Sequence, residues 1–460
     1  MKVIVCGAGK VGSEIATYLS AEGNDVVVID HDLGRIQKLS DSLDVQTIYG
    51  FASHPPILEQ AGADEVDLII AVTLSDEINM IACQIAYSLF NVKMKIARIR
   101  NQNYLNPKWE HLYTHNHMPI DVRISPELEV AQNIINRLHM PGAIDTIPIK
   151  DGVVKMALVR IDKDTRIKDK RIYNINNNLK ALNSKIFAII RQNKILIPQI
   201  TDRIEVGDLV YYIGEAKHSE KIMQEFGCHQ QEARNIIIVG GGTIGSFLAK
   251  TLEDDENDID VGVIEVNKGQ AQILAEKLND AIVVNGSALE EEILDEIGAK
   301  KAQTIIAVSN DDEVNILSCL LSKTMGCKKA ISLINNTSYA PLISSIGIDV
   351  VVNPREVTIS TILRYIRKGN IKEVYSLYNS TAEVLETQIK ENSLINGKKI
   401  CQIQTPEDVE FLAIIRDNQV MIIDEKDETA IKAGDYLIVL SMSSSVKKID
   451  KLFSLVENYF

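Results

Sequence analysis

Short apolar runs alternate with stretches of helical spacing over the first 124 residues of the chain. The runs lie at 2–6, 25–30, 45–49, 67–72, 95–99 and 120–124. Between them, apolar residues recur every three or four positions, as in Val11–Ser20 and Asn79–Phe90, which is the pattern of an amphipathic helix. This alternation predicts a parallel sheet with helices on both faces, that is, a doubly wound, Rossmann-like α/β fold.

The same pattern returns in the second half of the chain. Residues 3–12 read VIVCGAGKVG and residues 236–245 read IIIVGGGTIG. Residues 71–79 read AVTLSDEIN and residues 307–315 read AVSNDDEVN, in the same order. Ordered repetition over this length indicates two copies of one structural unit.

A second kind of segment follows each Rossmann-like unit. In the first copy it contains short β-rich runs at Val153–Ile161, Lys185–Arg191 and Asp208–Ile213, and then a helical pattern at Glu215–Phe226. The tetrapeptide AIIR occurs in both copies, at 188–191 and 413–416. With boundaries near Met140, Gln231 and Gly369, we expect Rossmann-like domains at 1–140 and 232–369 and small α+β domains at 141–231 and 370–460.

The glycine pattern GxGxxG follows the first predicted strand and opens a helix, which is the context that dinucleotide binding requires. The first glycine permits a tight turn, the second lets the backbone approach a pyrophosphate, and the third lets helix and strand pack closely. The helix N-terminus then offers unpaired N–H groups to the phosphates. The candidate residues are Gly7, Ala8, Gly9, Lys10 and Val11 in the first copy, and Gly240, Gly241, Gly242, Thr243 and Ile244 in the second.

An acidic residue ends the second predicted strand of each Rossmann-like unit. These residues are Asp30 and Glu265. A carboxylate there accepts hydrogen bonds from ribose hydroxyls and repels a 2′-phosphate, so NAD or an adenine nucleotide is favoured over NADP. One glycine loop could be only a tight turn, but two loops with two such acids favour two nucleotide sites.

The loop after the fourth predicted strand lies at the carboxyl edge of the sheet, where ligands of open α/β sheets bind. Thr73 stands at the strand tip and is the best candidate for ligand contact there. Ser75 and Asp76 have two equally good interpretations, because either could cap the next helix or contact a ligand.

Two arginines, Arg98 and Arg100, alternate along the fifth predicted strand with apolar residues. They could form an ion pair at the sheet edge or reach a nucleotide phosphate, and Arg98 is the better phosphate candidate. The second copy has Leu333 and Asn335 at these positions. Its site is therefore expected to bind more weakly or to bind another nucleotide.

Composition limits the classes of partner. A formal charge of −14 argues against phosphate-neutralising contacts with nucleic acid. We find no run of about 18 apolar residues and expect no direct membrane insertion, and the immediate start of a strand argues against a signal peptide. The six cysteines are scattered, Cys6 and Cys83 are expected to be small buried hydrophobes, and the pattern favours the reducing cytoplasm.

Three histidines cluster at His111, His115 and His117. A helix could place His111 and His115 on one face as metal ligands. Glu110 is the only nearby carboxylate, and it would point elsewhere if the segment is helical. The second copy has no histidines there, so a solvated or subunit-facing helix is the better interpretation, and we expect no metal site.

Catalysis is the main alternative to binding, because Rossmann repeats are common in oxidoreductases. An NAD-dependent oxidoreductase needs a substrate domain with an acid or base beside the nicotinamide. The two small segments share no histidine–carboxylate or lysine constellation. A pure scaffold would not need the acids and glycine loops, so nucleotide sensing is preferred over both.

Four motifs resemble the TrkA family, the cytoplasmic regulatory subunits of bacterial Trk potassium uptake systems. They are GAGKVG at 7–12, GFASHPPIL at 50–58, AVTLSDEINMIACQIAYSLFN at 71–91 and ARIR at 97–100. The resemblance implies tandem RCK halves, each a KTN domain followed by a TrkA-C domain, in a non-enzymatic homo-oligomer. A dimer or tetramer would form a ring on the cytoplasmic face of the cell membrane, beneath a TrkH-type potassium-translocating protein.

The resemblance also implies ligands and site residues. NAD(H) is the expected ligand, with ATP or ADP as candidates at one of the two sites. The first site would use Gly7 to Val11, Asp30, Thr73, Leu74 and Arg98, and the second Gly240 to Ile244, Glu265, Ser309 and Asn310.

Overall fold

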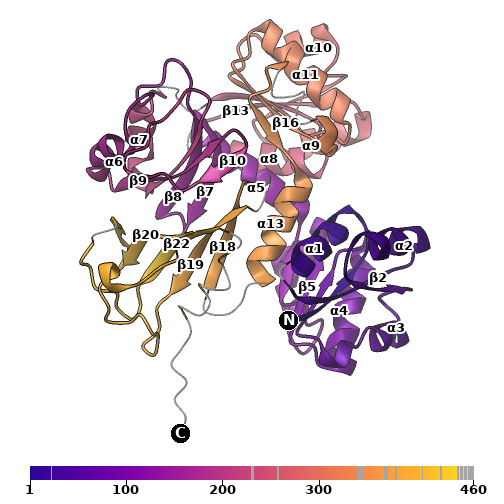
Figure 1. The fold of residues 1–460 in the computed structure, drawn as a ribbon. Coiled ribbons are helices and arrows are strands. Elements are labelled where there is room, and N and C mark those ends of the chain that lie inside the picture. The colour runs from indigo at the N-terminus through magenta and orange to yellow at the C-terminus, as the bar shows by residue number, and fades with distance from the viewer. Residues whose placement is uncertain are drawn as a thin grey trace. The chain divides into compact units, whose positions relative to one another are not determined.

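The structure is a computed structural model of the chain. It describes residues 1–21, 23–228, 233–255, 258–339, 346–366, 371–378, 381–406, 408–424 and 427–442, together with residues 445, 449 and 453. Two of the expected domain boundaries, Gln231 and Gly369, lie outside these ranges. The described residues form two six-stranded and two five-stranded sheets, so the predicted fold class is confirmed (Figure 1).

The first six-stranded sheet has the strand order β3-β2-β1-β4-β5-β6, and its neighbouring strands run parallel. Val3 to Cys6 in β1 are fully buried, as a strand covered on both faces requires. The strands are β1 Lys2–Cys6, β2 Asp25–Asp30, β3 Gln46–Tyr49, β4 Leu68–Ala71, β5 Met94–Arg98 and β6 Val122–Ile124, and the helices are α1 Lys10–Ala21, α2 Leu33–Ser42, α3 Pro55–Gln60, α4 Asp76–Phe90 and α5 Pro126–Leu138.

The second six-stranded sheet repeats this order as β14-β13-β12-β15-β16-β17. Its strands are β12 Asn235–Val239, β13 Asp260–Glu265, β14 Ile282–Asn285, β15 Thr304–Ala307, β16 Lys329–Leu333 and β17 Val350–Val352, and its helices are α8 Thr243–Glu253, α9 Lys268–Lys277, α10 Glu291–Glu296, α11 Asp312–Met325 and α13 Pro354–Ile366. The two sheets therefore confirm the repeat that the glycine motifs predict.

The two five-stranded sheets are built from antiparallel pairs, in the orders β10-β9-β11-β8-β7 and β18-β19-β22-β20-β21. The first has β7 Ala143–Ile149, β8 Val154–Arg160, β9 Ser184–Arg191, β10 Lys194–Leu196 and β11 Leu209–Glu215, with helices α6 Ile172–Lys180 and α7 Ser219–Glu225. The second has β18 Ile371–Leu377, β19 Ala382–Gln388, β20 Val409–Arg416, β21 Gln419–Ile422 and β22 Tyr436–Met442. The helix expected at Glu215–Phe226 is shorter, because β11 continues through Glu215.

The chain packs into two compact units that cut across the sequence repeat. One unit contains 1–132, 237–254 and 261–366, and the other contains 133–236, 255–260 and 367–460. The first unit thus holds both parallel sheets and the second holds both antiparallel sheets.

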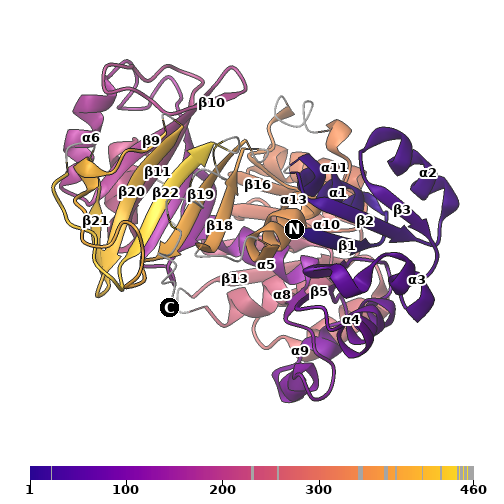
Figure 2. The ribbon, with the colours of Figure 1, turned by 60° about the horizontal axis from the view of Figure 1, so that its bottom comes forward.

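Within the first unit, a helix from the second repeat completes the core of the first. Helix α13 packs against α1 and β6 (Figures 1 and 2). Its residue Ile362 is fully buried in one cluster with Val3, Val5 and Ile15, and Tyr365 packs against that cluster. The linear boundary at residue 232 would assign α13 to the second Rossmann-like domain, whereas its apolar face lies in the core of the first sheet.

Within the second unit, the two antiparallel sheets share one apolar core. Phe187 and Ile190 of β9 lie in the same buried cluster as Leu412 and Ile415 of β20. Figure 2 shows the ribbons of β9 and β20. The small domains therefore bury their apolar faces against each other.

Candidate nucleotide site

The first glycine loop is tight because its glycines lack side chains. Gly7 has a φ of +110°, which L side chains rarely adopt. A Cβ on Gly12 would lie 1.8 Å from the carbonyl oxygen of Gly7, whereas a Cβ on Gly9 would meet only Arg35 Nη1, at 3.8 Å. The loop is thus close to the start of α1 and leaves the Gly9 backbone accessible to a ligand.

Asp30 braces this loop from the end of β2. It is buried, and its Oδ2 accepts a hydrogen bond of 2.5 Å from the Ala8 N–H. Its Oδ1 accepts from the Asp32 N–H at 2.8 Å, and Arg35 Nη1 lies 3.9 Å from Oδ2. Each carboxylate oxygen has two lone pairs, so Asp30 retains acceptor capacity for a ribose hydroxyl.

Asn79 ties the tips of two neighbouring strands together. Its Oδ1 accepts from the N–H of Thr73 at 2.9 Å and from the Thr73 hydroxyl at 2.7 Å. Its Nδ2 donates to the Arg98 carbonyl at 2.9 Å. Fully buried Asn79 thus holds the β4 and β5 tips in register beside the loop.

Ser75 and Asp76, for which the sequence allowed two interpretations, both have local structural roles. Ser75 is the N-cap of α4, and its hydroxyl accepts from the Ile78 N–H at 3.3 Å. The Asp76 carboxylate accepts from the N–H groups of Arg100 and Asn101 at 2.8–3.0 Å. Helix α4 accordingly begins at Asp76, near the expected Glu77.

Arg98 and Arg100 differ in their partners, as expected if Arg98 binds a phosphate and Arg100 does not. Arg100 forms an ion pair with Glu127, with Nε 2.9 Å from Oε1. Arg98 is half-buried, and burial lowers the pKa of its guanidinium. Its Nε is buried and has no hydrogen-bond partner among the described residues. A buried, unsatisfied guanidinium N–H is a strong donor that an anionic ligand would satisfy.

These residues converge on one cavity of about 550 Å³ at the carboxyl edge of the first sheet, within the usual size range of ligand pockets. All the predicted first-site residues line it except Ala8, whose N–H binds Asp30. The lining comprises Gly7, Gly9, Lys10, Val11, Ile29, Asp30, His31, Arg35, Gly50, Phe51, Ala52, Val72, Thr73, Leu74, Ser75, Ile78 and Arg98.

Sequence reasoning missed three informative residues of this cavity. Arg35 adds a third cation to Lys10 and Arg98. His31 and Phe51 stack with their ring centroids 5.1 Å apart and an interplanar angle of 13°. The motif GFASHPPIL, which supports the family resemblance, contains Phe51 and was a signal that this strand tip matters.

The second copy repeats the backbone scaffold. Gly240 has a φ of +99°, and Glu265 Oε2 accepts from the Gly241 N–H at 2.6 Å. Ser309 N–H and Oγ both donate to Asn315 Oδ1, at 2.9 and 2.7 Å, as Thr73 does to Asn79. The acid and the strand-tip network are therefore built alike in the two halves.

The side chains that face the ligand space differ between the halves. The equivalents of Lys10, Arg35 and Arg98 are Thr243, Gln270 and Leu333, and Gln270 Nε2 donates to the Gly241 carbonyl at 2.7 Å. Thr243 itself lines a second cavity of about 450 Å³, whose other lining residues come from the first repeat. Predicted residues Gly242 and Asn310 are exposed, and Ile244 is half-buried. The second site thus lacks the three cations of the first.

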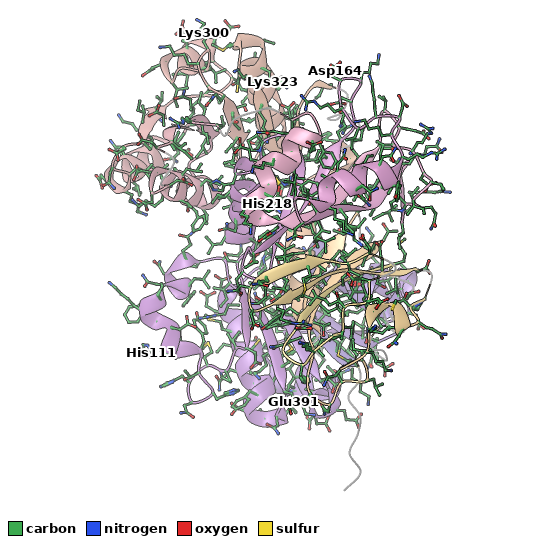
Figure 3. All side chains as sticks on the ribbon, turned by 90° about the vertical axis from the view of Figure 1, so that its left-hand side faces the viewer. His111, Asp164, His218, Lys300, Lys323 and Glu391 are labelled. Atoms are coloured by element: carbon green, nitrogen blue, oxygen red, sulfur yellow. The ribbon has the colours of Figure 1, made fainter. Side chains whose placement is uncertain are left out.

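The histidine cluster does not form a metal site among the described residues. The 3₁₀ helix Pro107–Tyr113 ends before His115, so His111 and His115 do not share a helix. Glu110 is paired with Arg123, and His111 lies on the surface (Figure 3). The helical spacing assumed for these histidines was wrong, because Asn106-Pro107 starts a 3₁₀ helix instead.

Cys6 and Cys83 are fully buried, as predicted. Both are free thiols, and burial raises the pKa of Cys83 to about 12. They therefore act as small apolar residues.

A family model described as the TrkA-N domain matches residues 3–126 and 236–354, that is, both parallel-sheet segments. The chain is 39% identical over 460 residues to the Trk system potassium uptake protein TrkA of Azorhizobium caulinodans, covering 100% of both chains. It is 36% identical over 457 residues to TrkA of Haemophilus influenzae, covering 98% of each. The chain belongs to the TrkA family. Membership places it among proteins of potassium uptake and confirms the family resemblance seen in the motifs.

Solved structures share the fold of this TrkA-family chain. The GsuK RCK domain matches with a TM-score of 0.62 at 19% identity, covering 98% of this chain and 94% of that one. The GsuK channel bound to NAD matches with a TM-score of 0.62 at 18% identity, covering 98% and 78%. These likenesses show that the chain has the fold of RCK domains.

No helix among the described residues combines the length and apolar character needed to cross a membrane.

Proposed function

We propose that this TrkA-family chain is a nucleotide-sensing regulatory subunit that controls potassium transport through a TrkH-type membrane subunit. The observation that carries the proposal is the cavity beside the first glycine loop. It brings together a glycine loop suited to phosphate, an acid at a strand end and an arginine whose buried Nε is unsatisfied. Family membership over the full length connects this cavity with potassium uptake.

The residues of the first cavity fit NAD or a related adenine nucleotide. Lys10, Arg35 and Arg98 offer cations for a pyrophosphate, and Asp30 can accept from ribose hydroxyls. NAD(H) is the proposed ligand, and the GsuK channel, whose structure has a similar fold, binds NAD. ATP or ADP is a candidate at one of the two sites, because the second site keeps the acid but differs from the first in its other lining side chains.

Regulation would work through differential affinity. A nucleotide that binds two conformations of the assembly with different affinities shifts their populations. The shift depends only on the difference between the two affinities. Coupling energies of about 1–3 kcal/mol are usual for such linkage and change populations several-fold. Membership of a potassium uptake family disfavours the alternative, an NAD-dependent oxidoreductase.

The location and assembly follow from the same proposal. The chain would form a homo-oligomeric ring, a dimer or tetramer, on the cytoplasmic face of the cell membrane. Contact with the membrane would be peripheral and would run through the TrkH-type potassium-translocating protein.

Calorimetric titration tests the proposal. The purified chain is titrated with NADH, NADPH, ATP and ADP, and so are Asp30→Ala and Glu265→Ala. We expect NADH or an adenine nucleotide to bind and NADPH not to bind. Asp30→Ala should abolish binding at the first site, and Glu265→Ala should abolish binding at the second. Thermal unfolding of the variants checks that the loop scaffold survives. Absence of binding by every nucleotide, or binding unaffected by either substitution, contradicts the sensor role.

Potassium flux is the second step. The chain is added to vesicles that contain the TrkH-type protein, with and without the nucleotide that binds. We expect the nucleotide to change the potassium flux. The change should be smaller when the Asp30→Ala variant replaces the wild-type chain. Nucleotide binding without any change in flux would contradict the regulatory role while leaving the binding site intact.

A further inference from the structure

Equivalent strands of the two small domains carry opposite charges at one position. Strand β9 reads SKIFAIIR and strand β20 reads VEFLAIIR, so the shared AIIR aligns Lys185 with Glu410. Both strands belong to the unit that holds the two antiparallel sheets.

Lys185 and Glu410 contact each other across the interface between these sheets. Lys185 Nζ donates to Glu410 Oε1 at 2.6 Å, to the Ile423 carbonyl at 2.8 Å and to the Phe411 carbonyl at 3.2 Å. The Lys185 side chain is 6% exposed and that of Glu410 is 28% exposed. A buried ammonium with one carboxylate and two carbonyl acceptors is fully satisfied.

The two small domains thus meet at matching positions of their β9 and β20 strands. In an isologous pair of identical domains, a residue at such a position meets its own copy. Two first small domains would bring lysine against lysine here, and two second small domains would bring glutamate against glutamate. Only the pairing of a first with a second small domain is neutral.

The apolar part of the interface does not discriminate in this way. Phe187, Ala188 and Ile190 of β9 align with Leu412, Ala413 and Ile415 of β20, and all six are buried in the shared cluster. Burial of apolar area is non-directional and favours any such pairing. Selection must therefore come from the polar contacts.

A second polar contact has the same asymmetry. Asn183 Nδ2 donates to the Val420 carbonyl at 3.1 Å. The equivalent of Asn183 is Asp408, whose carboxylate is an acceptor and cannot donate to a carbonyl. Pairing of two second small domains would thus lose this hydrogen bond as well.

We propose that the Lys185–Glu410 pair determines which domains associate. It selects the pairing of the first small domain with the second and disfavours the pairing of identical small domains from two copies of the chain. A buried charge that meets a like charge costs much more than the neutral pair gains, so this contact acts mainly by excluding wrong partners.

Charge reversal in the full-length chain tests the proposal. K185E places glutamate at both positions and E410K places lysine at both, so each variant is mispaired within itself. The two variants, carrying different affinity tags, are co-expressed, and complexes containing both tags are isolated and quantified. We expect the ratio of mixed to unmixed oligomers to rise about tenfold over a co-expressed wild-type pair, because opposite charges then meet between chains.

The doubly reversed variant, K185E/E410K, separates selection from failure to fold. We expect each single variant to lower the midpoint of thermal unfolding by about 5–10 °C. The double variant should recover part of this loss, because opposite charges meet again while Glu at position 185 still faces the Phe411 and Ile423 carbonyls. The double variant should also return the mixed-to-unmixed ratio to the wild-type value.

The exposed pair Lys180–Asp424 is the matched control. It joins the same two domains at 2.7 Å, but its side chains are 69% and 54% exposed. K180D co-expressed with D424K should leave the ratio unchanged, because water screens this pair. The proposal is overturned if K185E and E410K also leave the ratio unchanged, or if the exposed pair shifts it equally.

Discussion

Arg98 and Arg100 lie two residues apart, yet the structure gives them different surroundings. Arg98 lines the nucleotide cavity, whereas Arg100 pairs with Glu127. The second repeat has Leu333 and Asn335 at these positions. Each arginine can therefore be replaced by the residue type that the second repeat has at that position. We expect Arg98→Leu to weaken NADH binding about 10–100-fold in calorimetry, since it removes a charge-assisted hydrogen bond.

Arg100→Asn is the matched control at the residue scale. It removes the same charge from a half-exposed side chain outside the cavity, and we expect a change in NADH affinity below about threefold. Equal losses in the two variants would show that overall charge, and not the position of Arg98, governs affinity.

At the element scale, Glu253 fastens the end of α8 to the segment before β14. Its Oε2 accepts from the N–H groups of Asn279, Asp280 and Ala281, at 2.8, 3.0 and 3.1 Å. Burial by itself would raise the pKa of Glu253, but these donors and Lys250 outweigh it and lower the pKa to about 2. The ionised form is therefore the one that joins the two elements.

We expect Glu253→Gln to reduce the stability of the chain by about 1–2 kcal/mol at pH 7. The folded pKa lies below the unfolded value, so the wild-type advantage is complete above the unfolded pKa and is lost as the pH falls toward about 2. Urea unfolding at pH 7 and pH 3.5 measures the difference.

Asp254→Asn is the control for this pH dependence. Its carboxylate also binds Lys250 but is 60% exposed, so it should have little effect at either pH. A constant difference between wild type and Glu253→Gln across the pH range would contradict ionisation as the cause.

At the scale of the whole molecule, the core of the first parallel sheet depends on a helix more than 200 residues away in sequence. The side chain of Ile362 in α13 is fully buried and packs in one apolar cluster with Val3 and Ile15. We expect Ile362→Ala to destabilise this core by about 2–5 kcal/mol. Hydrogen exchange of the β1 and α1 amides should accelerate, although these elements are distant from α13 in the sequence.

Leu317→Ala in α11 is the control for this long-range effect. Leu317 belongs to the same repeat as Ile362 but is 48% exposed, so its removal should cost about 0.5 kcal/mol or less. If β1 and α1 exchange as slowly in Ile362→Ala as in wild type, α13 does not support the first sheet.

Most elements of the fold could be predicted, because their periodicity is strong. The strands expected at 2–6 and 25–30 match β1 and β2. Helix α6 was missed, since its sequence IYNINNNLK contains residues of low helix propensity. It forms because Ile172, Ile175 and Leu179 are buried in the core of the first small domain. Tertiary packing overrides local preference there.

The candidate site was predictable where the chemistry lies in a motif. The glycine loop and Asp30 are local signals, and the structure brings them to one cavity. Arg35 and the stacked His31 and Phe51 could not be derived in the same way. They come from a helix and from two strand tips, and only the sheet order places them together.

The sequence by itself determined the repeat, the parallel sheets and the two loops that begin their first helices. These features rest on periodicity and steric needs within a few residues, which a linear pattern records. Only the tertiary structure decided that α13 completes the first core and that Lys185 meets Glu410. Such pairings depend on which distant surfaces are complementary in shape and charge, and no local pattern contains that comparison.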